Sequence, residues 1–357
     1  MGTREEQAAD LVERLFEDLL GAVTTFSVCL GDRLGLYRAL ASGGPATGSE
    51  LAARAGIHER YAREWLEQQA ADGILEADDE ADPARRSYGL PDGHAEVLTD
   101  ANSLSYFSPF ARLIVAGGLQ LRALAEAYRT GAGVPWEAFG DEMRESQGDA
   151  NRPMFLHQLA QEYLPLVPDI HERLLSEAGA RVADIGCGMG WSAIALAKAY
   201  PHVTVDGFDL DGPSVEAARR NAEEAGVGDR ARFHHEDAAD AKGTYDLVAA
   251  FECLHDMPRP VEVLSTMRRL AGDAGAVVVM DERAAESFAT PGDAIERLLY
   301  GWSLLICLPD SMSHEPTAAT GTVMRPSTLR SYAIEAGFSD IEVLPIENDF
   351  FRFYRLV

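Results

Sequence analysis

The sequence predicts a two-domain α/β protein, in which a mostly helical N-terminal part precedes a mostly parallel sheet with helices on both faces. The length of 357 residues suits two cores better than one. Helical spacing of apolar residues dominates the first 71 residues, whereas short apolar strands alternate with helices from Arg181 onward. Hydrophobic residues make up 46% and charged residues 25%, which is typical of a globular protein.

Charge and cysteine content argue against several classes of protein. The formal net charge is −27 and only two lysines occur, so contacts with nucleic acid or an anionic membrane are unfavourable. The four cysteines form no C-x-x-C pair, and eight charges in residues 1–20 argue against a signal peptide. No apolar run reaches the roughly 18 residues of a membrane span. We therefore expect a cytoplasmic protein that binds neither nucleic acid nor membrane.

The first hundred residues show a winged-helix pattern. Leu11 and Leu15 recur at helical spacing in the first segment, and a later helix carries Tyr61, Trp65 and Leu66 on one face. The expected elements are helices over 4–41, 49–56 and 58–71 and short strands over 73–75 and 87–90. A helix, a turn, a second helix and a two-stranded wing together form the arrangement of a winged helix.

Charge argues against DNA binding by this winged helix. Residues 1–100 contain nine arginines and no lysine against twenty carboxylates, which is the opposite of a DNA reader. The candidate recognition helix carries Glu59, Glu64 and Glu67 beside Arg60 and Arg63. We interpret the winged helix as a packing and dimerisation module, and we expect a homodimer joined through it.

Residues 101–180 are expected to be mostly helical, with prolines that divide them into short pieces. We therefore expect a winged-helix domain over 1–100, a helical connecting region over 101–160 that covers the active site, and a catalytic domain over 161–357. Side chains that could line an acceptor pocket, although most are expected in the core, are Tyr106, Phe107, Phe110, Trp136, Phe155, Tyr163, Trp302 and Met312.

The segment RVADIGCGMGW predicts a ligand site at a strand end. It is an apolar strand that enters a glycine turn at Gly186, Gly188 and Gly190 and precedes a helix, so the backbone can approach a ligand closely. A dinucleotide site would need a further glycine where Trp191 stands. Asp184 precedes the turn by two residues and suits an ammonium group, whereas it would repel a pyrophosphate. These features favour S-adenosylmethionine, which has an ammonium group and no phosphate.

The next strands end in carboxylates as well. The expected strand from Val203 ends at Asp209, where doubly wound folds place an acceptor for ribose hydroxyls. Asp211 competes for this role, but it already belongs to the turn that follows. A third strand over 231–235 leads to Asp237, which could accept from an adenine amino group. A fourth strand is expected to end at Phe251.

The ordered motifs VADIGCGMG, DGFD, HEDA and YDLVAAF resemble those of the class I S-adenosylmethionine-dependent methyltransferases, over about residues 160–357. The resemblance implies a Rossmann-like, seven-stranded sheet whose last strand is antiparallel, and strands are expected over 275–281, 341–346 and 350–356. With the N-terminal winged helix, the chain resembles the bacterial small-molecule methyltransferases of that type. S-Adenosylmethionine is the implied cofactor, and a small molecule is the implied methyl acceptor.

The resemblance also implies a role for each residue of the cofactor site. A carboxylate serves the methionyl amino group directly or through water, the glycine turn lies under the methionyl and sugar parts, and the later strand ends bind ribose, adenine and the methionyl chain. In that order the residues are Asp184, then Gly186, Cys187 and Gly188, then Asp209, then Leu210, Asp237 and Ala238, and finally Phe251.

Glu252 and His255 follow the fourth strand and are the candidate catalytic residues. Methyl transfer from a sulfonium needs alignment and desolvation, and a hydroxyl or carbon acid also needs a base. His255 is the preferred base, with Asp256 as a possible orienting neighbour, and Glu252 could hydrogen-bond cofactor or substrate instead. His314 lies in a polar loop, so these histidines and Asp256 could hold a metal, although we assign none.

Four functions remain open from the sequence. The motifs favour a methyltransferase that acts on oxygen, carbon or nitrogen of a small molecule of secondary metabolism. A metal-assisted C-methyltransferase for a keto acid is one alternative, and a regulator that binds DNA and senses S-adenosylmethionine is another. A methyltransferase-like scaffold without turnover is the last.

Overall fold

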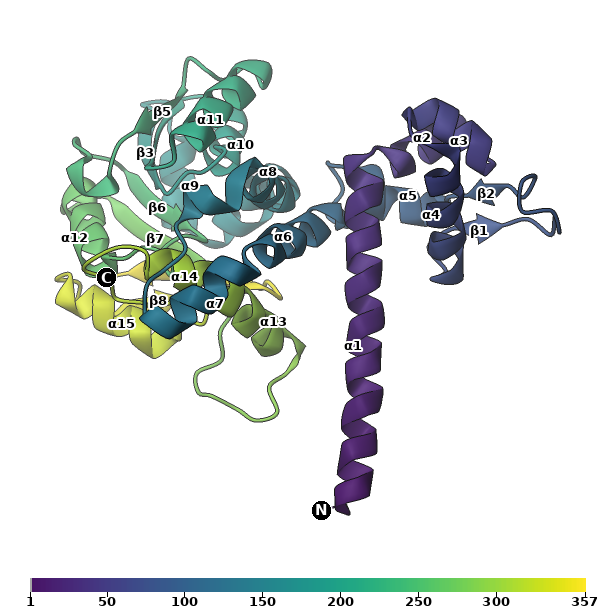
Figure 1. Ribbon diagram of the computed structural model, residues 1–357. Coiled ribbons are helices and arrows are strands. Elements are labelled where there is room, and N and C mark those ends of the chain that lie inside the picture. Colours follow the sequence, from purple (N-terminus) through teal and green to yellow (C-terminus); the bar gives the residue numbers. More distant parts are fainter. Residues whose placement is uncertain (1) are drawn as a thin grey trace. The chain divides into compact units, whose positions relative to one another are not determined.

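The computed structural model describes residues 2–357, which divide into two compact units, one up to Val115 and one from Ala116. Figure 1 shows the elements of both units. Each unit is described by itself below. The finer division into 1–100, 101–160 and 161–357 stays a proposal.

The N-terminal unit is a winged helix, as expected. Its elements are α1 (Arg4–Arg33), α2 (Leu36–Gly43), α3 (Gly48–Ala55), α4 (Glu59–Ala71), β1 (Glu76–Ala77), β2 (Tyr88–Gly89) and α5 (Asp92–Thr99), followed by the first part of α6 (Ser108–Leu119). The single helix expected over 4–41 is wrong, because Gly35 has a φ of 68° and separates α1 from α2. Gly56, with a φ of 68°, ends α3 where the sequence places its end.

Two further expectations for this unit are corrected. The strand expected over 73–75 is absent, because the amide groups of Ile74 and Leu75 bond to the carbonyl of Gln69 and so close the last turn of α4. Strand β1 begins only at Glu76. The shared face expected for Tyr61, Trp65 and Leu66 holds for the last two, which are buried, whereas Tyr61 is 77% exposed.

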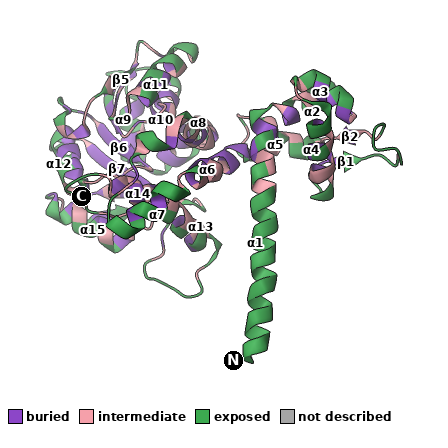
Figure 2. Cartoon of the chain, in the orientation of Figure 1, coloured by how far each residue is buried: buried purple, intermediate pink, exposed green. Residues whose placement is uncertain are grey.

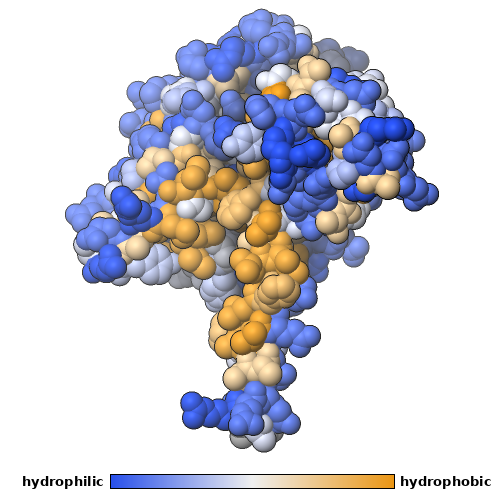
Figure 3. Space-filling model, turned by 45° about the vertical axis from the view of Figure 1, so that its right-hand side comes forward, coloured by the Kyte–Doolittle hydropathy of each residue, from blue (hydrophilic) through white to orange (hydrophobic). Residues whose placement is uncertain are grey.

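Helix α1 carries an apolar face that the rest of the N-terminal unit does not cover. Every residue from Gly2 to Val23 is exposed, although leucine, valine and phenylalanine recur along the helix at spacings of three and four. Figure 3 shows this apolar surface along the helix. Its exposed members are Leu11, Val12, Leu15, Phe16, Leu19, Leu20, Val23, Phe26 and Leu30. Within residues 2–357 no single helix is long and apolar enough to cross a membrane; α1 and α2 pass that test only together, across a bend of 64°.

The C-terminal unit is built on a seven-stranded sheet of order β5-β4-β3-β6-β7-β9-β8. The four pairings β5–β4, β4–β3, β3–β6 and β6–β7 are parallel and the pairing β7–β9 is antiparallel, which confirms the predicted fold class. The strands are β3 (Ala180–Ile185), β4 (Val203–Asp209), β5 (Ala231–His235), β6 (Leu247–Phe251), β7 (Ala276–Glu282), β8 (Ile341–Val343) and β9 (Phe351–Leu356). Every side chain of β6 and β7 is buried, as expected for parallel strands covered on both faces (Figure 2).

Helices cover both faces of this sheet (Figure 1). One apolar cluster joins the sheet to η1, α9, α10 and α11, and the other joins it to α12 and α15. The helices are α7 (Leu121–Thr130), α8 (Trp136–Met154), π-helix η1 (Phe155–Tyr163), η2 (Leu164–Leu166), α9 (Pro168–Leu175), α10 (Trp191–Ala199), α11 (Gly212–Glu224), η3 (Ala238–Asp240), α12 (Pro260–Ala271), α13 (Ala294–Trp302), π-helix η4 (Ser303–Cys307), α14 (Leu308–Ser311) and α15 (Pro326–Glu335).

The sheet brings the expected site residues to one edge. Strand β3 pairs with β4 and with β6, and Ile185 lies opposite Phe208 and Ala250. The parallel strands therefore end side by side, so the segments that follow Ile185, Phe208 and Ala250 meet at the carboxyl edge. Strand β7 ends at the same edge, because Phe251 pairs with Met280.

Candidate active site

The turn after β3 requires glycine. A Cβ on Gly186 would lie 2.7 Å from Sγ of Cys253, and one on Gly190 would lie 2.7 Å from the ring of Phe233. Both residues have a positive φ, 69° and 81°, which other residues rarely adopt. Gly188 has a φ of 49° and open space on its Cβ side. The turn therefore offers bare backbone to a ligand at the N-terminus of α10.

Asp184 is a buried carboxylate with one oxygen unused. Its side chain is 1% exposed, and Oδ2 accepts a hydrogen bond of 2.5 Å from the hydroxyl of Ser192. Oδ1 has no hydrogen-bond partner within residues 2–357. Burial raises the pKa of Asp184 to about 7, and the nearby Asp209 adds to the shift. The oxygen without a partner can accept a hydrogen bond from an ammonium group, directly or through water. A nearby positive charge would also favour the ionised form of this buried carboxylate.

Asp209 and Asp211 differ in how much of each carboxylate is engaged. Asp209 accepts from the backbone amides of Gly188 and Asp211, each at 2.8 Å, so each of its oxygens keeps a second lone pair. Asp211 receives two bonds from Arg144, at 2.7 and 2.8 Å, and caps α11 through Ser214 at 3.0 Å. Asp209 therefore has acceptor capacity for a ribose, whereas Asp211 is committed to structure. The contacts support the choice of Asp209.

The remaining expected cofactor residues lie along the same edge. Leu210 is 62% exposed and follows Asp209 directly, which leaves its side chain available to a planar base. Asp237 caps η3 through the amide of Ala239 at 2.8 Å and also pairs with Arg259 at 3.3 Å. Three of the expected cofactor residues are buried, and their side chains fill space at this edge rather than form hydrogen bonds. They are Cys187, Ala238 and Phe251.

Glu252 follows β6 in a strained conformation. Its φ is 54°, and among residues 2–357 only it and Ala319 have a positive φ without being glycine. Its amide donates to the carbonyl of Met280 at 2.7 Å, and its carboxylate accepts from the side-chain amide of Asn151. Burial raises the pKa of Glu252 to about 7, against the effect of Asn151, His255 and Gln147. A half-buried carboxylate with this pKa is suited to accept a proton at neutral pH.

His255 lies in a cage of carboxylates. Its Nδ1 is 2.8 Å from Asp281 and 2.9 Å from Glu282, its Nε2 is 3.0 Å from Asp256, and the ring is 2% exposed. Burial alone would lower the pKa of His255, but Asp256, Glu282 and Asp281 outweigh burial and raise it well above the usual 6.5. Burial raises the pKa of Glu282 well above its usual value. His255 therefore carries its proton at neutral pH.

Three members of this cluster, Asp281, Glu282 and Cys307, were not anticipated from the sequence, whereas Asp256 was. Asp281 and Glu282 end β7, so the carboxyl-edge rule applied to the fifth strand would have found them. Asp256 contacts His255 because the segment is a turn rather than a helix. His314 is exposed and, within residues 2–357, lies in no close group of potential metal ligands. Cys307 joins His255 and Asp256 instead, with ligand atoms within 4.8 Å of one another.

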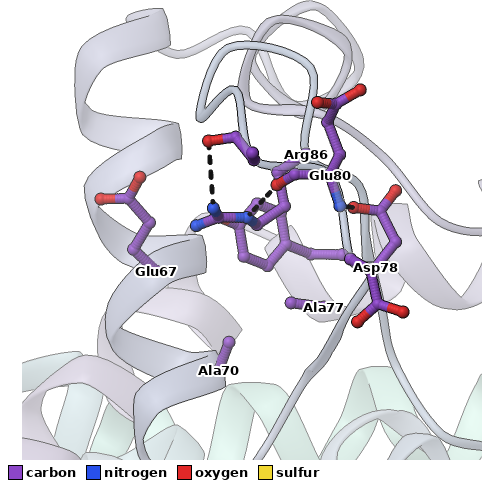
Figure 4. A pocket seen from close by; sticks show the side chains of 9 residues that line it. Glu67, Ala70, Ala77, Asp78, Glu80 and Arg86 are labelled. Atoms are coloured by element: carbon purple, nitrogen blue, oxygen red, sulfur yellow. Dashed lines mark hydrogen bonds between the residues drawn. The ribbon is translucent and has the colours of Figure 1, made fainter.

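A hollow in the N-terminal unit is a separate feature (Figure 4). Helix α4 supplies Glu67 and Ala70 to its wall, and the wing supplies Asp78 and Arg86. Arg86 donates to the backbone carbonyl of Glu80 at 2.9 Å. None of the motif residues lines this hollow, so it is not the methyl-transfer site.

Comparisons with known proteins agree with this geometry. A family model described as "Methyltransferase domain" matches residues 176–306, and one described as "Rv2258c-like winged HTH domain" matches residues 21–100. The ubiquinone biosynthesis O-methyltransferase of Aromatoleum aromaticum is 30% identical over 190 residues, which span 51% of this chain and 74% of that protein. The chain belongs to the class I S-adenosylmethionine-dependent methyltransferases. Two further curated methyltransferases are matched over 62% and 60% of their length.

Solved structures show the same fold for the whole methyltransferase. The mitomycin 7-O-methyltransferase has a TM-score of 0.68 and 20% identity, over 99% of both chains. The O-methyltransferase of neocarzinostatin biosynthesis, in complex with S-adenosylmethionine and 2-hydroxy-5-methyl naphthoic acid, has a TM-score of 0.62 and 21% identity, over 94% of this chain and 95% of that one.

The residues of this methyltransferase fit its cofactor, S-adenosylmethionine. The glycine turn leaves room for close approach, Asp209 keeps free lone pairs, and the orphaned oxygen of Asp184 demands a cation. Bound there, the cofactor supplies a methyl group on a sulfonium, whose departure needs no acid catalyst.

Proposed function

We propose that this methyltransferase methylates a hydroxyl group of a small molecule, with Glu252 as the proton acceptor and His255 as its charged neighbour. The observation that carries the proposal is the position of Glu252. Its half-buried carboxylate stands at the carboxyl end of β6, in a strained backbone conformation, with a pKa of about 7. Strain of this kind persists where the surroundings hold a residue in a functional geometry.

The other residues take the roles that the family resemblance implies. Asp209 and the glycine turn hold the ribose end, Asp184 attracts the ammonium group, and Leu210, Asp237 and Ala238 bind adenine. Phe251 and the ring of Phe155, whose centroids are 5.7 Å apart, keep water from the methionyl side. Holding the cofactor in this way fixes the position of the methyl group, and alignment of that group with the acceptor oxygen is the main requirement of the reaction.

Glu252 suits the base better than His255, which the sequence favoured. Both ring nitrogens of His255 lie within 3.0 Å of carboxylates, so the imidazole is already protonated and has no lone pair to offer. Its positive charge instead favours the ionised form of Glu252. His255 as the base stays a prediction. The two assignments predict opposite orders of activity for the Glu252→Gln and His255→Gln variants.

The test is methyl transfer from radiolabelled S-adenosylmethionine to hydroxyaromatic acids, with 2-hydroxy-5-methyl naphthoic acid as the first probe. Glu252→Gln should lower the rate by about 10²–10⁴-fold while S-adenosylhomocysteine still binds. His255→Gln should lower it less. A Glu252→Gln protein with full activity beside an inactive His255→Gln protein would restore His255 as the base. Failure of every hydroxyl acceptor beside transfer to amines would refute O-methylation.

A second candidate function is metal-assisted C-methylation of a keto acid. One observation favours it, namely the convergence of His255, Asp256 and Cys307 with ligand atoms within 4.8 Å of one another. These nitrogen, oxygen and sulfur donors suit a divalent transition metal. Burial raises the pKa of Cys307, so the thiol would lose its proton only to a bound metal.

The same proposal includes a homodimer. The exposed apolar face of α1 supports it, because soluble proteins seldom leave so continuous an apolar surface in water. The face recurs at helical spacing, so it suits another helix rather than a small ligand. We assign the equivalent helix of a second copy as its partner.

A further inference from the structure

Helix α8 lies directly against the cofactor turn. A Cβ on Gly148 would lie 2.4 Å from Sδ of Met189, so the glycine makes room for the Met189 side chain against the helix. One turn later the guanidinium of Arg152 lies 4.7 Å from the ring centroid of Trp191. One turn earlier Arg144 makes its ion pair with Asp211, at 2.7 Å, with both side chains 10% exposed. Three contacts along one helix thus fix its position on the carboxyl edge.

Two side-chain amides of this fixed helix converge on one carboxylate. Gln147 and Asn151 are four residues apart on α8, so their side chains lie on the same face of the helix. Asn151 donates a hydrogen bond to the carboxylate of Glu252, and the side-chain amide of Gln147 acts on the same carboxylate by lowering its pKa. The backbone of Glu252 is fixed by the hydrogen bond that its amide donates to the carbonyl of Met280 and by its positive φ. The carboxylate is therefore held from the helix and from the sheet.

The choice of amides has a chemical consequence. An arginine or lysine in the place of Asn151 would keep Glu252 ionised but make it a weak base, because an opposite charge strongly favours the ionised form. Without any donor, burial would keep the carboxyl group protonated near neutral pH. Neutral N–H donors offset part of the effect of burial, so the pKa of Glu252 is raised less than burial alone would raise it. They also fix which oxygen lone pairs remain free to receive a proton.

We propose that Gln147 and Asn151 are positioning residues, an amide clamp that orients the carboxylate of Glu252 for proton transfer. The inference rests on the proposed role of Glu252 in methyl transfer and extends it to a helix that carries none of the sequence motifs. The clamp also ties proton transfer to the cofactor site, because the same helix contacts Met189, Trp191 and Asp211.

The test measures the titration of Glu252 directly. Infrared difference spectra between the protein and its Glu252→Gln variant, without cofactor, report the carboxyl band of this one residue. The variants are Asn151→Leu and Gln147→Met, which keep approximate size and remove the donors. The control is Gln161→Met, because Gln161 is exposed and bonds only to a backbone carbonyl at 3.3 Å. Thermal melting checks that each variant is folded.

Each clamp variant should raise the titration midpoint of Glu252 by roughly one pH unit or more, since a hydrogen bond to a charged group favours that charged form. The pH–rate profile should shift upward by the same amount. Unchanged midpoints in both variants would overturn the clamp, even if Glu252→Gln is inactive. A shifted midpoint beside a fully active Glu252→Gln protein would refute the proposed base and leave the clamp as an observed property of Glu252.

Discussion

Asp209 carries the sharpest prediction about the cofactor site. Replacing it with Asn keeps the shape of the side chain but removes the charge and one of two acceptor oxygens. In the free protein the two oxygens accept from the amides of Gly188 and Asp211, each at 2.8 Å. An Asn therefore turns its NH₂ group toward one of these donors. It also loses one of the two bonds expected to ribose.

The magnitude follows from these contacts. A hydrogen bond to a charged group contributes about 1.5–3 kcal/mol, and the variant weakens at least one such bond in the complex. Since 1.4 kcal/mol corresponds to tenfold in affinity, S-adenosylhomocysteine should bind at least about tenfold more weakly. The loss of the turn contact lowers stability as well, because Gly188 or Asp211 then lacks an acceptor.

Isothermal titration calorimetry with S-adenosylhomocysteine measures the effect, and Asp211→Asn is the matched comparison. Asp211 caps α11 and pairs with Arg144, so its variant should mainly lower the melting temperature and weaken binding less than the Asp209 variant. Normal binding by Asp209→Asn together with a large loss in Asp211→Asn would show that the ribose acceptor is Asp211.

Three other outcomes are expected. The methyl-transfer rate should rise with pH through about 7, because Glu252 must be ionised to accept a proton, and Glu252→Gln should abolish that dependence. Light scattering should give a dimer of the 38.7 kDa chain, and Leu15→Glu with Leu19→Glu should convert it to a monomer; a wild-type monomer at micromolar concentration contradicts the α1 interface. If methyl transfer is metal-free, a strong chelator leaves its rate unchanged, whereas a loss restored by a divalent ion, and absent in Cys307→Ser, would favour the metal-assisted alternative.

The central strands β6 and β7 were predictable because they are apolar runs buried on both faces. The predicted bounds of β4 and β5 are those observed, since each strand alternates between more and less buried residues and ends in a polar residue. The wing was less predictable, because β1 and β2 have two residues each and a period of two cannot be recognised in so short a run. The break at Gly35 was missed because apolar periodicity continues across it.

The candidate site was predictable only where topology alone brings residues together. The carboxyl ends of parallel strands must meet, so residues such as Asp209 and Glu252 could be placed at one edge of the sheet from the sequence. Asn151 could not, because it is 101 residues away from Glu252 and the docking of α8 depends on tertiary packing. The carboxylates around His255 are an intermediate case. Asp281 lies at the end of a parallel strand, so its place at the edge follows from topology, whereas its contact with His255 depends on the turn after β6.

The raised pKa values at the site lead to a last prediction, that binding of the methyl donor releases protons. Burial holds the pKa of both Asp184 and Glu252 near 7, so each is partly protonated at neutral pH in the free protein. A nearby cation lowers the pKa of a carboxyl group. The ammonium group is common to S-adenosylmethionine and S-adenosylhomocysteine, but only the former has the sulfonium charge. We therefore expect Asp184 to respond to both ligands and Glu252 to respond mainly to S-adenosylmethionine.

Calorimetry at pH 7 in phosphate and in Tris separates the two contributions, because the buffers differ in ionisation enthalpy and the heat difference counts the protons released. S-Adenosylmethionine should release more protons than S-adenosylhomocysteine, and Glu252→Gln should remove the excess while Asp184→Asn reduces the shared part. Equal release by both ligands in the unmodified protein would mean that Glu252 does not sense the sulfonium, and would place it away from the transferred methyl group. An excess that persists in Glu252→Gln would assign the proton release to another buried carboxylate. Asp310 of α14 is the next candidate, since burial and Asp256 raise its pKa to about 7.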